Sequence, residues 1–99
     1  MSAKKIGDGT STMTKDFTVA NKLGIHARPA ALFVKTANRF RCEIFVEKDG
    51  ETVTGKSIMG LMMRAAGPGS KVTVHANGQD ANQALAEIET LMLRKFDED

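Results

Sequence analysis

The sequence lacks the features that mark several special classes of protein. It has nine glycines and two prolines among 99 residues, and 41% of its residues are hydrophobic, which excludes fibrous and intrinsically disordered chains. It has one cysteine, Cys42, so the internal disulfide that stabilises many small secreted domains cannot form. Residues 7–12 are polar or glycine where a signal peptide would be apolar. The sequence therefore predicts a folded protein of a reducing compartment, with the cytoplasm as its expected location.

Long apolar segments and an excess of charge are also missing. The longest apolar run covers residues 29–34, far short of the roughly 18 residues that suggest a membrane-spanning helix. Lys and Arg number 14 against 12 Asp and Glu, so the formal net charge of +2 creates no strong field for nucleic acid. We therefore expect neither membrane insertion nor bulk nucleic-acid binding.

The chain divides into a short tail and one domain. The first dozen residues mix small, polar and turn-forming types, so they bury too little apolar surface to offset the entropy of ordering them. We predict a flexible tail over residues 1–13 and a folded domain over residues 14–99. A domain of this size is too small for the substrate pocket of most self-sufficient metabolic enzymes, which favours a carrier, an adaptor or a binding module.

Hydrophobic periodicity predicts four short strands and three helices. Alternating apolar residues predict strands near residues 16–19, 42–47, 51–54 and 72–76. Three- and four-residue spacing predicts helices over residues 27–38, 58–63 and 81–95. Asp80 and Gln83 resemble a capping box at the start of the third helix. The order β-α-β-β-α-β-α predicts an α+β fold of two layers, in which helices cover one face of an antiparallel or mixed sheet.

One nucleotide-binding pattern is present. Residues 50–57, GETVTGKS, match the phosphate-binding motif G-x-x-x-x-G-K-[ST] letter for letter. A functional loop needs a strand before the first glycine and a flexible turn between the two glycines. Here the predicted strand lies between the glycines, and Glu51 would place negative charge beside a phosphate. We therefore interpret the match as a coincidence of spacing.

His26 is a candidate for phosphoryl chemistry, because it lies at the N-terminal edge of the first predicted helix. A helix N-terminus presents unpaired amides and about half a positive charge, so it binds phosphate and disfavours the imidazolium. The neutral ring could accept a phosphoryl group, which Arg28 and the first-turn amides could hold. The residues alone leave open that His26 is an imperfect cap and Arg28 a solvated charge. His75 is expected on the exposed register of the fourth strand, as a surface residue without a partner.

The short second helix carries a polar start and several methionines. Ser57 precedes it as a candidate N-cap, and that role alone would explain the residue. A phosphoserine there would add a charge of about −1.5 to −2 that the helix dipole tolerates but an acidic partner does not. Met59, Met62 and Met63 cannot all face inward on so short a helix, so they are candidates for a soft partner-binding surface.

Two motifs resemble segments of one family. Residues 24–30, GIHARPA, resemble the active-site segment of HPr, the histidine-containing phosphocarrier of the bacterial phosphoenolpyruvate:sugar phosphotransferase system. Residues 55–60, GKSIMG, resemble its regulatory serine segment, and the similarity extends from about Phe17 to Phe96. The resemblance implies an open-faced β-sandwich, a four-stranded antiparallel sheet covered on one face by three helices. With it we expect a monomer without a cofactor or a metal ion.

The resemblance also implies the chemistry of a phosphoryl relay rather than of an autonomous enzyme. His26 would accept a phosphoryl group on Nδ1 from phospho-enzyme I and pass it to an EIIA-type acceptor, with Arg28 stabilising the phosphate. Ser57 aligns with the serine that HPr kinase/phosphorylase modifies in many bacteria, and that modification would impede transfer at His26. The implied partner-binding residues are Ala27, Ile58, Met59 and Met62.

Two alternatives stay open. Residues 21–24, NKLG, are more similar to nitrogen-regulatory relatives than to many sugar-transport members, so a mainly regulatory protein of nitrogen or catabolite control is possible. A distant alternative is a small RNA-binding α+β domain, in which residues 67–70, GPGS, would clamp a nucleic-acid backbone between Arg64 and Lys71. Clamping loops of that kind stand between two helices, whereas this one leads into a predicted strand.

Overall fold

The computed structural model describes residues 12–20, 22, 24–64 and 67–97 of the chain. This part of the chain contains four strands and three α-helices in the predicted order, and a short 3-10 helix that was not predicted. The elements are β1 (Thr12–Thr18), α1 (Ala27–Ala37), β2 (Glu43–Lys48), β3 (Glu51–Thr54), α2 (Ile58–Arg64), β4 (Lys71–Asn77), α3 (Ala81–Leu93) and η2 (Lys95–Asp97).

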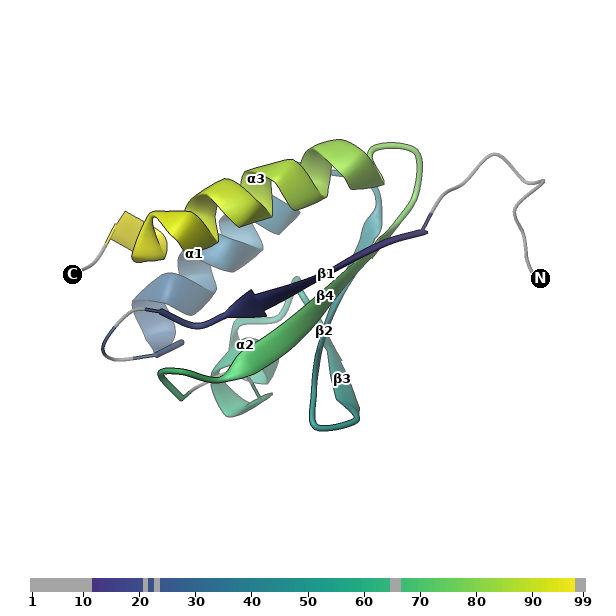
Figure 1. The fold of residues 1–99 in the computed structure, drawn as a ribbon. Coiled ribbons are helices and arrows are strands. Elements are labelled where there is room, and N and C mark those ends of the chain that lie inside the picture. Colours follow the sequence, from purple (N-terminus) through teal and green to yellow (C-terminus); the bar gives the residue numbers. More distant parts are fainter. Residues whose placement is uncertain (1–11, 21, 23, 65–66, 98–99) are drawn as a thin grey trace.

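The strands form one antiparallel sheet in the order β1-β4-β2-β3 (Figure 1). The helices cover one face of this sheet and leave the other face open, as the resemblance implied. Figure 1 shows α1 and α3 side by side and running in opposite directions, so the start of α1 lies near the end of α3. The choice between an antiparallel and a mixed sheet, which periodicity left open, is therefore settled as antiparallel.

The hydrophobic core lies between the sheet and the helices. Alternate residues of β4 and β2 point into it, and Val74 and Ile44 are almost completely buried. On the helix side, Phe33 of α1 and Ile88 of α3 belong to the same buried cluster. Each large side chain buried in this way contributes about 1.5–3 kcal/mol, so the two-residue period of the strands and the helical period of α1 and α3 together determine the layered fold.

Strand β1 begins earlier than predicted. Thr12 pairs with Asn77 and Met13 with Ala76, so these two residues belong to the sheet rather than to the tail. The length of β1 matches that of its neighbour β4 and does not follow from its own apolar residues, of which Met13 is exposed and Phe17 is only partly buried. The rest of the predicted tail, residues 1–11, lies outside the described residues.

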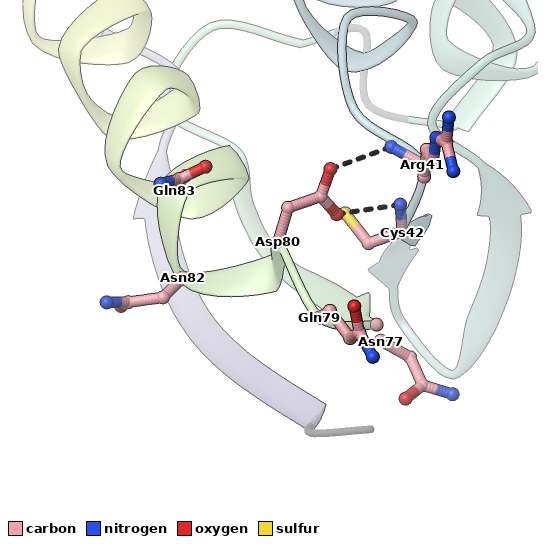
Figure 2. Close-up of a pocket in the computed structure, with 8 residues that line it drawn as sticks. Arg41, Cys42, Asn77, Gln79, Asp80, Asn82 and Gln83 are labelled. Carbon is pink, nitrogen blue, oxygen red and sulfur yellow. Dashed lines mark hydrogen bonds between the residues drawn. The ribbon is translucent and has the colours of Figure 1, made fainter. Parts of the chain in front are cut away.

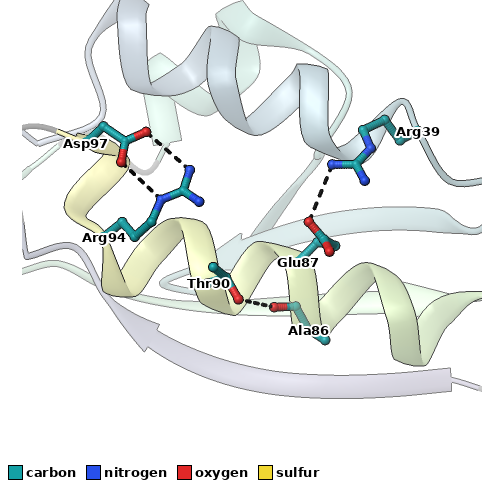
Figure 3. A network of polar contacts seen from close by, with 6 residues as sticks. All are labelled: Arg39, Ala86, Glu87, Thr90, Arg94 and Asp97. Atoms are coloured by element: carbon teal, nitrogen blue, oxygen red, sulfur yellow. Dashed lines mark hydrogen bonds and ion pairs between the residues drawn. The ribbon is translucent and has the colours of Figure 1, made fainter.

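The third helix ends earlier than predicted, at Leu93. Lys95, Phe96 and Asp97 all have positive φ angles, between 54° and 60°, which costs roughly 1–2 kcal/mol for each non-glycine residue. The turn places Phe96 in the core with 1% of its surface exposed, and this burial offsets part of the cost. An ion pair between Arg94 and Asp97 spans the turn at 3.0 Å, as Figure 3 shows.

The capping-box interpretation of Asp80 and Gln83 is wrong. Asp80 is the N-cap residue of α3, but its side chain makes no hydrogen bond to that helix. Its carboxylate instead accepts the backbone N–H groups of Arg41 at 2.8 Å and Cys42 at 2.9 Å (Figure 2). These two amides lead into β2, which lies next to β4 in the sheet. The carboxylate therefore joins the start of α3 to the start of β2, a contact between segments far apart in the sequence.

Replacing Asp80 by Asn should destabilise the fold at neutral pH, because the side-chain amide offers one oxygen acceptor where the carboxylate offers two. The Arg41 N–H, with a smaller effect from the Cys42 N–H, lowers the pKa of Asp80 below its usual 3.8. The folded protein therefore binds this proton less readily than the unfolded chain, so the stabilisation is present above pH 3.8 and is lost as the pH falls. In urea unfolding, the stability difference between parent and variant should narrow in acid, and a constant difference would contradict this role of the charge.

Candidate functional site

His26 lies at the N-terminus of α1, as predicted. It is the N-cap residue, with an extended backbone, and its carbonyl oxygen accepts the N–H of Ala30 at 3.0 Å. Its imidazole makes no capping hydrogen bond and is partly exposed. The side chain therefore does not serve as the helix cap, which disfavours the alternative in which capping alone explains the residue.

The first turn of α1 has the electrostatics of an anion site. Pro29 has no N–H, and helix geometry leaves the N–H groups of Ala27 and Arg28 without intrahelical acceptors. No acidic residue lies in this turn, and the side chain of Arg28 is exposed. The helix dipole, two backbone amides and a guanidinium therefore act at the same end of α1 as His26.

Ser57 is the N-cap of α2, as predicted. Its hydroxyl oxygen accepts the N–H of Gly60 at 3.1 Å, and its carbonyl oxygen accepts the N–H of Leu61 at 3.1 Å. Ser57 remains partly exposed. Because α2 packs against α1, a charge added at Ser57 would act on a helix that touches the one carrying His26.

The exposed side of α2 is apolar. Leu61 is buried and Met62 packs partly against the core, whereas Ile58 is 41% exposed and Met59 67% exposed. Ala27, the predicted contact residue on α1, is exposed as well. The resemblance did not imply Met63 as a contact residue, but its spacing had already placed it among the methionines expected to form a partner-binding surface, and the structure leaves it 70% exposed. It lies four residues after Met59, on the same helix face.

We call Ile58, Met59, Met62 and Met63 the α2 patch.

The phosphate-loop match is a coincidence of spacing, as interpreted. Strand β3 runs between the two glycines and pairs with β2. Gly50 has a φ angle of +81° in the hairpin turn, and a Cβ on Gly55 would lie 2.6 Å from Ile44, so both glycines have structural reasons. The ammonium of Lys56 donates a hydrogen bond to the carbonyl oxygen of Phe40 at 3.0 Å. The lysine of the motif is therefore bound to the chain itself.

The prediction that His75 has no partner is wrong. Its Nε2 lies 2.8 Å from Oε1 of Glu47 on β2, and its Nδ1 lies 3.1 Å from Oγ1 of Thr14 on β1. The imidazole thus bridges three neighbouring strands on the open face of the sheet. The residue type gave no sign of this, because the two partners come from strands whose order the sequence does not determine.

The loop at residues 67–70 does not resemble a nucleic-acid clamp. The N–H of Gly69 donates to the carbonyl oxygen of Val19 at 2.7 Å, and the N–H of Val19 donates to the carbonyl oxygen of Ser70 at 2.8 Å. These bonds hold the loop against the segment after β1, and the loop leads directly into β4. Asn21 and Leu23, on which the nitrogen-regulatory alternative depends, lie outside the described residues, as does the side chain of Arg64.

A polar cleft of about 580 Å³ lies away from His26. It is lined by Arg41, Cys42 and the residues around the start of α3, as Figure 2 shows. Arg41 and Cys42 follow the C-terminal end of α1, whereas His26 precedes its N-terminal end, and a helix of 11 residues is about 16 Å long. Among the described residues, no three His, Cys, Asp or Glu side chains are grouped to hold a metal ion. None of the described helices has the length and apolar character needed to cross a membrane.

The open-faced sandwich with a histidine and an arginine at the start of its first helix is the arrangement expected of a histidine phosphocarrier. The chain belongs to the HPr family, because the family model "PTS HPr component phosphorylation site" matches residues 13–93. The chain is therefore a phosphocarrier protein of the phosphotransferase system, and its partners are proteins of that system, such as enzyme I and EIIA.

Similar proteins include both carrier and regulatory members of the family. The HPr-like protein Crh of Halalkalibacterium halodurans is 55% identical over 74 residues, which are 75% of this chain and 88% of that protein. The phosphocarrier protein HPr of Treponema pallidum is 45% identical over 87 residues, covering 88% of this chain and 99% of that protein. The crystal structure of HPr-C-His from Thermoanaerobacter tengcongensis matches with a TM-score of 0.84 at 42% identity, covering 88% of this chain and 98% of that chain.

Replacing Ser57 by Ala should lower the free energy of unfolding by about 1 kcal/mol, because the Gly60 N–H loses its acceptor. Ser57→Asp is the matched control, since aspartate caps a helix as well as serine does and should stay within about 0.5 kcal/mol of the parent. Urea unfolding of the three proteins checks this. An equal loss in both variants would show that the hydroxyl does not act as a cap.

Proposed function

We propose that His26 is the residue of this phosphocarrier that accepts the phosphoryl group. The observation that carries the proposal is the position of His26 at the N-terminus of α1, where its imidazole does not cap the helix. The donor would be phospho-enzyme I and the acceptor an EIIA-type protein. His75, the only other histidine of the chain, has both ring nitrogens engaged on the open face of the sheet.

Transfer needs a neutral ring with a lone pair directed at phosphorus. The lone pair of Nδ1 forms the new nitrogen–phosphorus bond while the bond from phosphorus to the donor breaks, and the ring proton stays on Nε2. The transition state is loose, with charge spread over the three phosphoryl oxygens, so positioning and electrostatics supply most of the catalysis. The N–H groups of Ala27 and Arg28 supply fixed partial charges for these oxygens.

Arg28 would hold the phosphate on both sides of the transfer. Its guanidinium can donate two parallel hydrogen bonds to phosphoryl oxygens, and its position in the first turn of α1 keeps it near His26. Because Arg28 is exposed, this stabilisation is screened by water. A modest stabilisation suits a carrier, whose phosphohistidine must persist between partners and still give up its phosphate.

Docking would use Ala27 and the α2 patch. These residues lie on the two packed helices that begin at His26 and Ser57. A small apolar surface gives the fast dissociation that a carrier needs. We propose that a monomer acts in the cytoplasm without a cofactor or metal ion, because His26 and Arg28 come from the same helix and the site needs no second copy. Solved relatives include an HPr dimer and a Crh dimer.

A second, regulatory function at Ser57 is favoured by the similarity of this chain to Crh proteins. One of the similar solved structures is that of Crh, the catabolite repression HPr of Bacillus subtilis. A phosphate placed on the Ser57 hydroxyl by an HPr kinase/phosphorylase would stay at the N-terminus of α2, where the helix tolerates negative charge. It would also bring that charge next to the α2 patch. Repulsion of an acidic partner surface would then slow transfer at His26.

His26→Ala should abolish phosphorylation by phosphoenolpyruvate and enzyme I, because no other side chain of the site offers a nucleophilic nitrogen. Intact-mass measurement of the parent should show one added phosphate that is lost in acid. His75→Ala is the matched control and should take up phosphate as the parent does. A parent that gains no phosphate from any cognate enzyme I, or a His26→Ala variant that gains an acid-labile one, would refute the assignment.

Arg28→Ala should slow phosphoryl transfer about tenfold, the effect of losing roughly 1.4 kcal/mol of transition-state stabilisation. Arg39→Ala is the control, because Arg39 follows the other end of α1 and pairs with Glu87 of α3 at 3.4 Å (Figure 3). Rapid-quench measurement of the transfer rate from phospho-enzyme I compares the two variants. Equal transfer rates in the Arg28→Ala and Arg39→Ala variants would show that Arg28 does not stabilise the transferred phosphate.

A further inference from the structure

The exposed apolar surface beside Ser57 consists mostly of thioether groups. The chain has six methionines, and Met92 is only 6% exposed, Met13 is 36% exposed, and Met62 is partly buried against the core. Met59 and Met63 are 67% and 70% exposed, and among the described large hydrophobic residues only Leu93 is more exposed. Because they are four residues apart on α2, their sulfur atoms share one helix face.

We infer that Met59 and Met63 form a peroxide-sensitive modification site, at which oxidation to methionine sulfoxide weakens docking of the phosphotransferase partners. The inference rests on the proposed function, because the α2 patch is the surface that we propose the partners contact. Oxidation would add a redox input to the same surface that the proposed phosphorylation of Ser57 controls.

The reaction needs hydrogen peroxide and no other reactant. A sulfur lone pair attacks one peroxide oxygen, the sulfur–oxygen bond forms, and the oxygen–oxygen bond breaks. The departing oxygen leaves as water after a proton moves to it from the oxygen bound to sulfur. Sulfur loses two electrons and the peroxide gains them. Methionine sulfoxide reductases reverse the change with a dithiol as reductant.

The one thiol of the chain competes poorly for peroxide. Cys42 is 3% exposed. Burial is the main cause that raises the pKa of its thiol to about 11, and the neighbouring Asp80 carboxylate adds to the effect. The thiolate is the reactive form, so at neutral pH almost all of Cys42 is in the unreactive form and is shielded as well. Among the residues that the structure describes, the exposed thioethers of Met59 and Met63 are therefore the first groups that peroxide reaches.

Oxidation should change the surface without unfolding the helix. Helix α2 is held by the Ser57 cap at one end and by the buried side chain of Leu61, and neither contact involves Met59 or Met63. A sulfoxide oxygen binds water strongly, and a docked partner would have to remove that water without replacing its hydrogen bonds. We therefore expect the affinity of partners to fall by about tenfold when both sulfur atoms are oxidised.

The test treats the full chain with hydrogen peroxide and follows it by peptide mass spectrometry and by binding to enzyme I. Sulfoxide should form at Met59 and Met63 before Met13 and last at Met92. Binding to enzyme I, measured by heteronuclear NMR titration, should weaken about tenfold, and treatment with methionine sulfoxide reductases should restore it. Circular dichroism should be unchanged by the oxidation.

Two variants separate the site from general oxidation, each compared with its own untreated form. Met59→Leu/Met63→Leu should lose no further affinity on peroxide treatment, whereas Met13→Leu, the matched control, should lose as much as the parent. The inference is overturned if the oxidised parent binds enzyme I unchanged, if the double variant remains equally sensitive, or if the loss accompanies unfolding. An untreated chain that binds enzyme I but accepts no phosphate overturns the proposed role of His26 instead, and the binding titration still decides the inference.

Discussion

The burial of β4 is the constraint on which the rest of the structure depends. β4 lies between β1 and β2, and its inward residues Val72, Val74 and Ala76 are all almost fully buried. A strand with this surface must be covered, and here α3 packs on β4 and β1 while α1 packs against α3 and runs in the opposite direction. The direction of α1, and hence the end of the molecule at which its N-terminus lies, follows from that packing. The site proposed at His26 would thus be positioned by apolar contacts that include neither His26 nor Arg28.

Two helices of this fold begin at a polar residue that bears on the proposed function, but the two cap residues act differently. At the start of α1 the cap position holds a histidine whose side chain does not cap, so the positive end of an 11-residue helix is left to act on a bound anion. At the start of α2 the cap position holds Ser57, whose hydroxyl accepts the Gly60 N–H at 3.1 Å. At the start of α2 a side chain of the chain itself therefore accepts an amide, whereas at the start of α1 the amides of the first turn would be available to the phosphoryl group of the proposed transfer.

Local patterns predicted the parts of the molecule that depend on local physics. The two-residue and 3.6-residue periods located the strands and helices, and Ser57 was recognised as a cap because capping acts over three residues. The errors concern contacts between distant segments. Asp80 looked like a cap until the amides of Arg41 and Cys42 were brought beside it, and His75 acquired partners only through the strand order. The left-handed turn at Phe96 is likewise stabilised by burial of its ring among core residues from distant parts of the chain, which the local sequence does not indicate.

Several polar contacts lie just beyond the C-terminal end of α1, opposite the end at which the site at His26 is proposed. Beyond its C-terminus, Arg39 pairs with Glu87, the carbonyl oxygen of Phe40 accepts the Lys56 ammonium, and the next two amides bind Asp80. These contacts connect the segment after α1 to α3 and to the turn after β3. The proposed docking residues lie on two packed helices, so a partner that docks there would have little backbone to order, which keeps the entropic cost of association low. A carrier that must bind two partners in turn, through one small surface and with modest affinity, benefits from a site that is exposed at one end of a helix anchored firmly at the other.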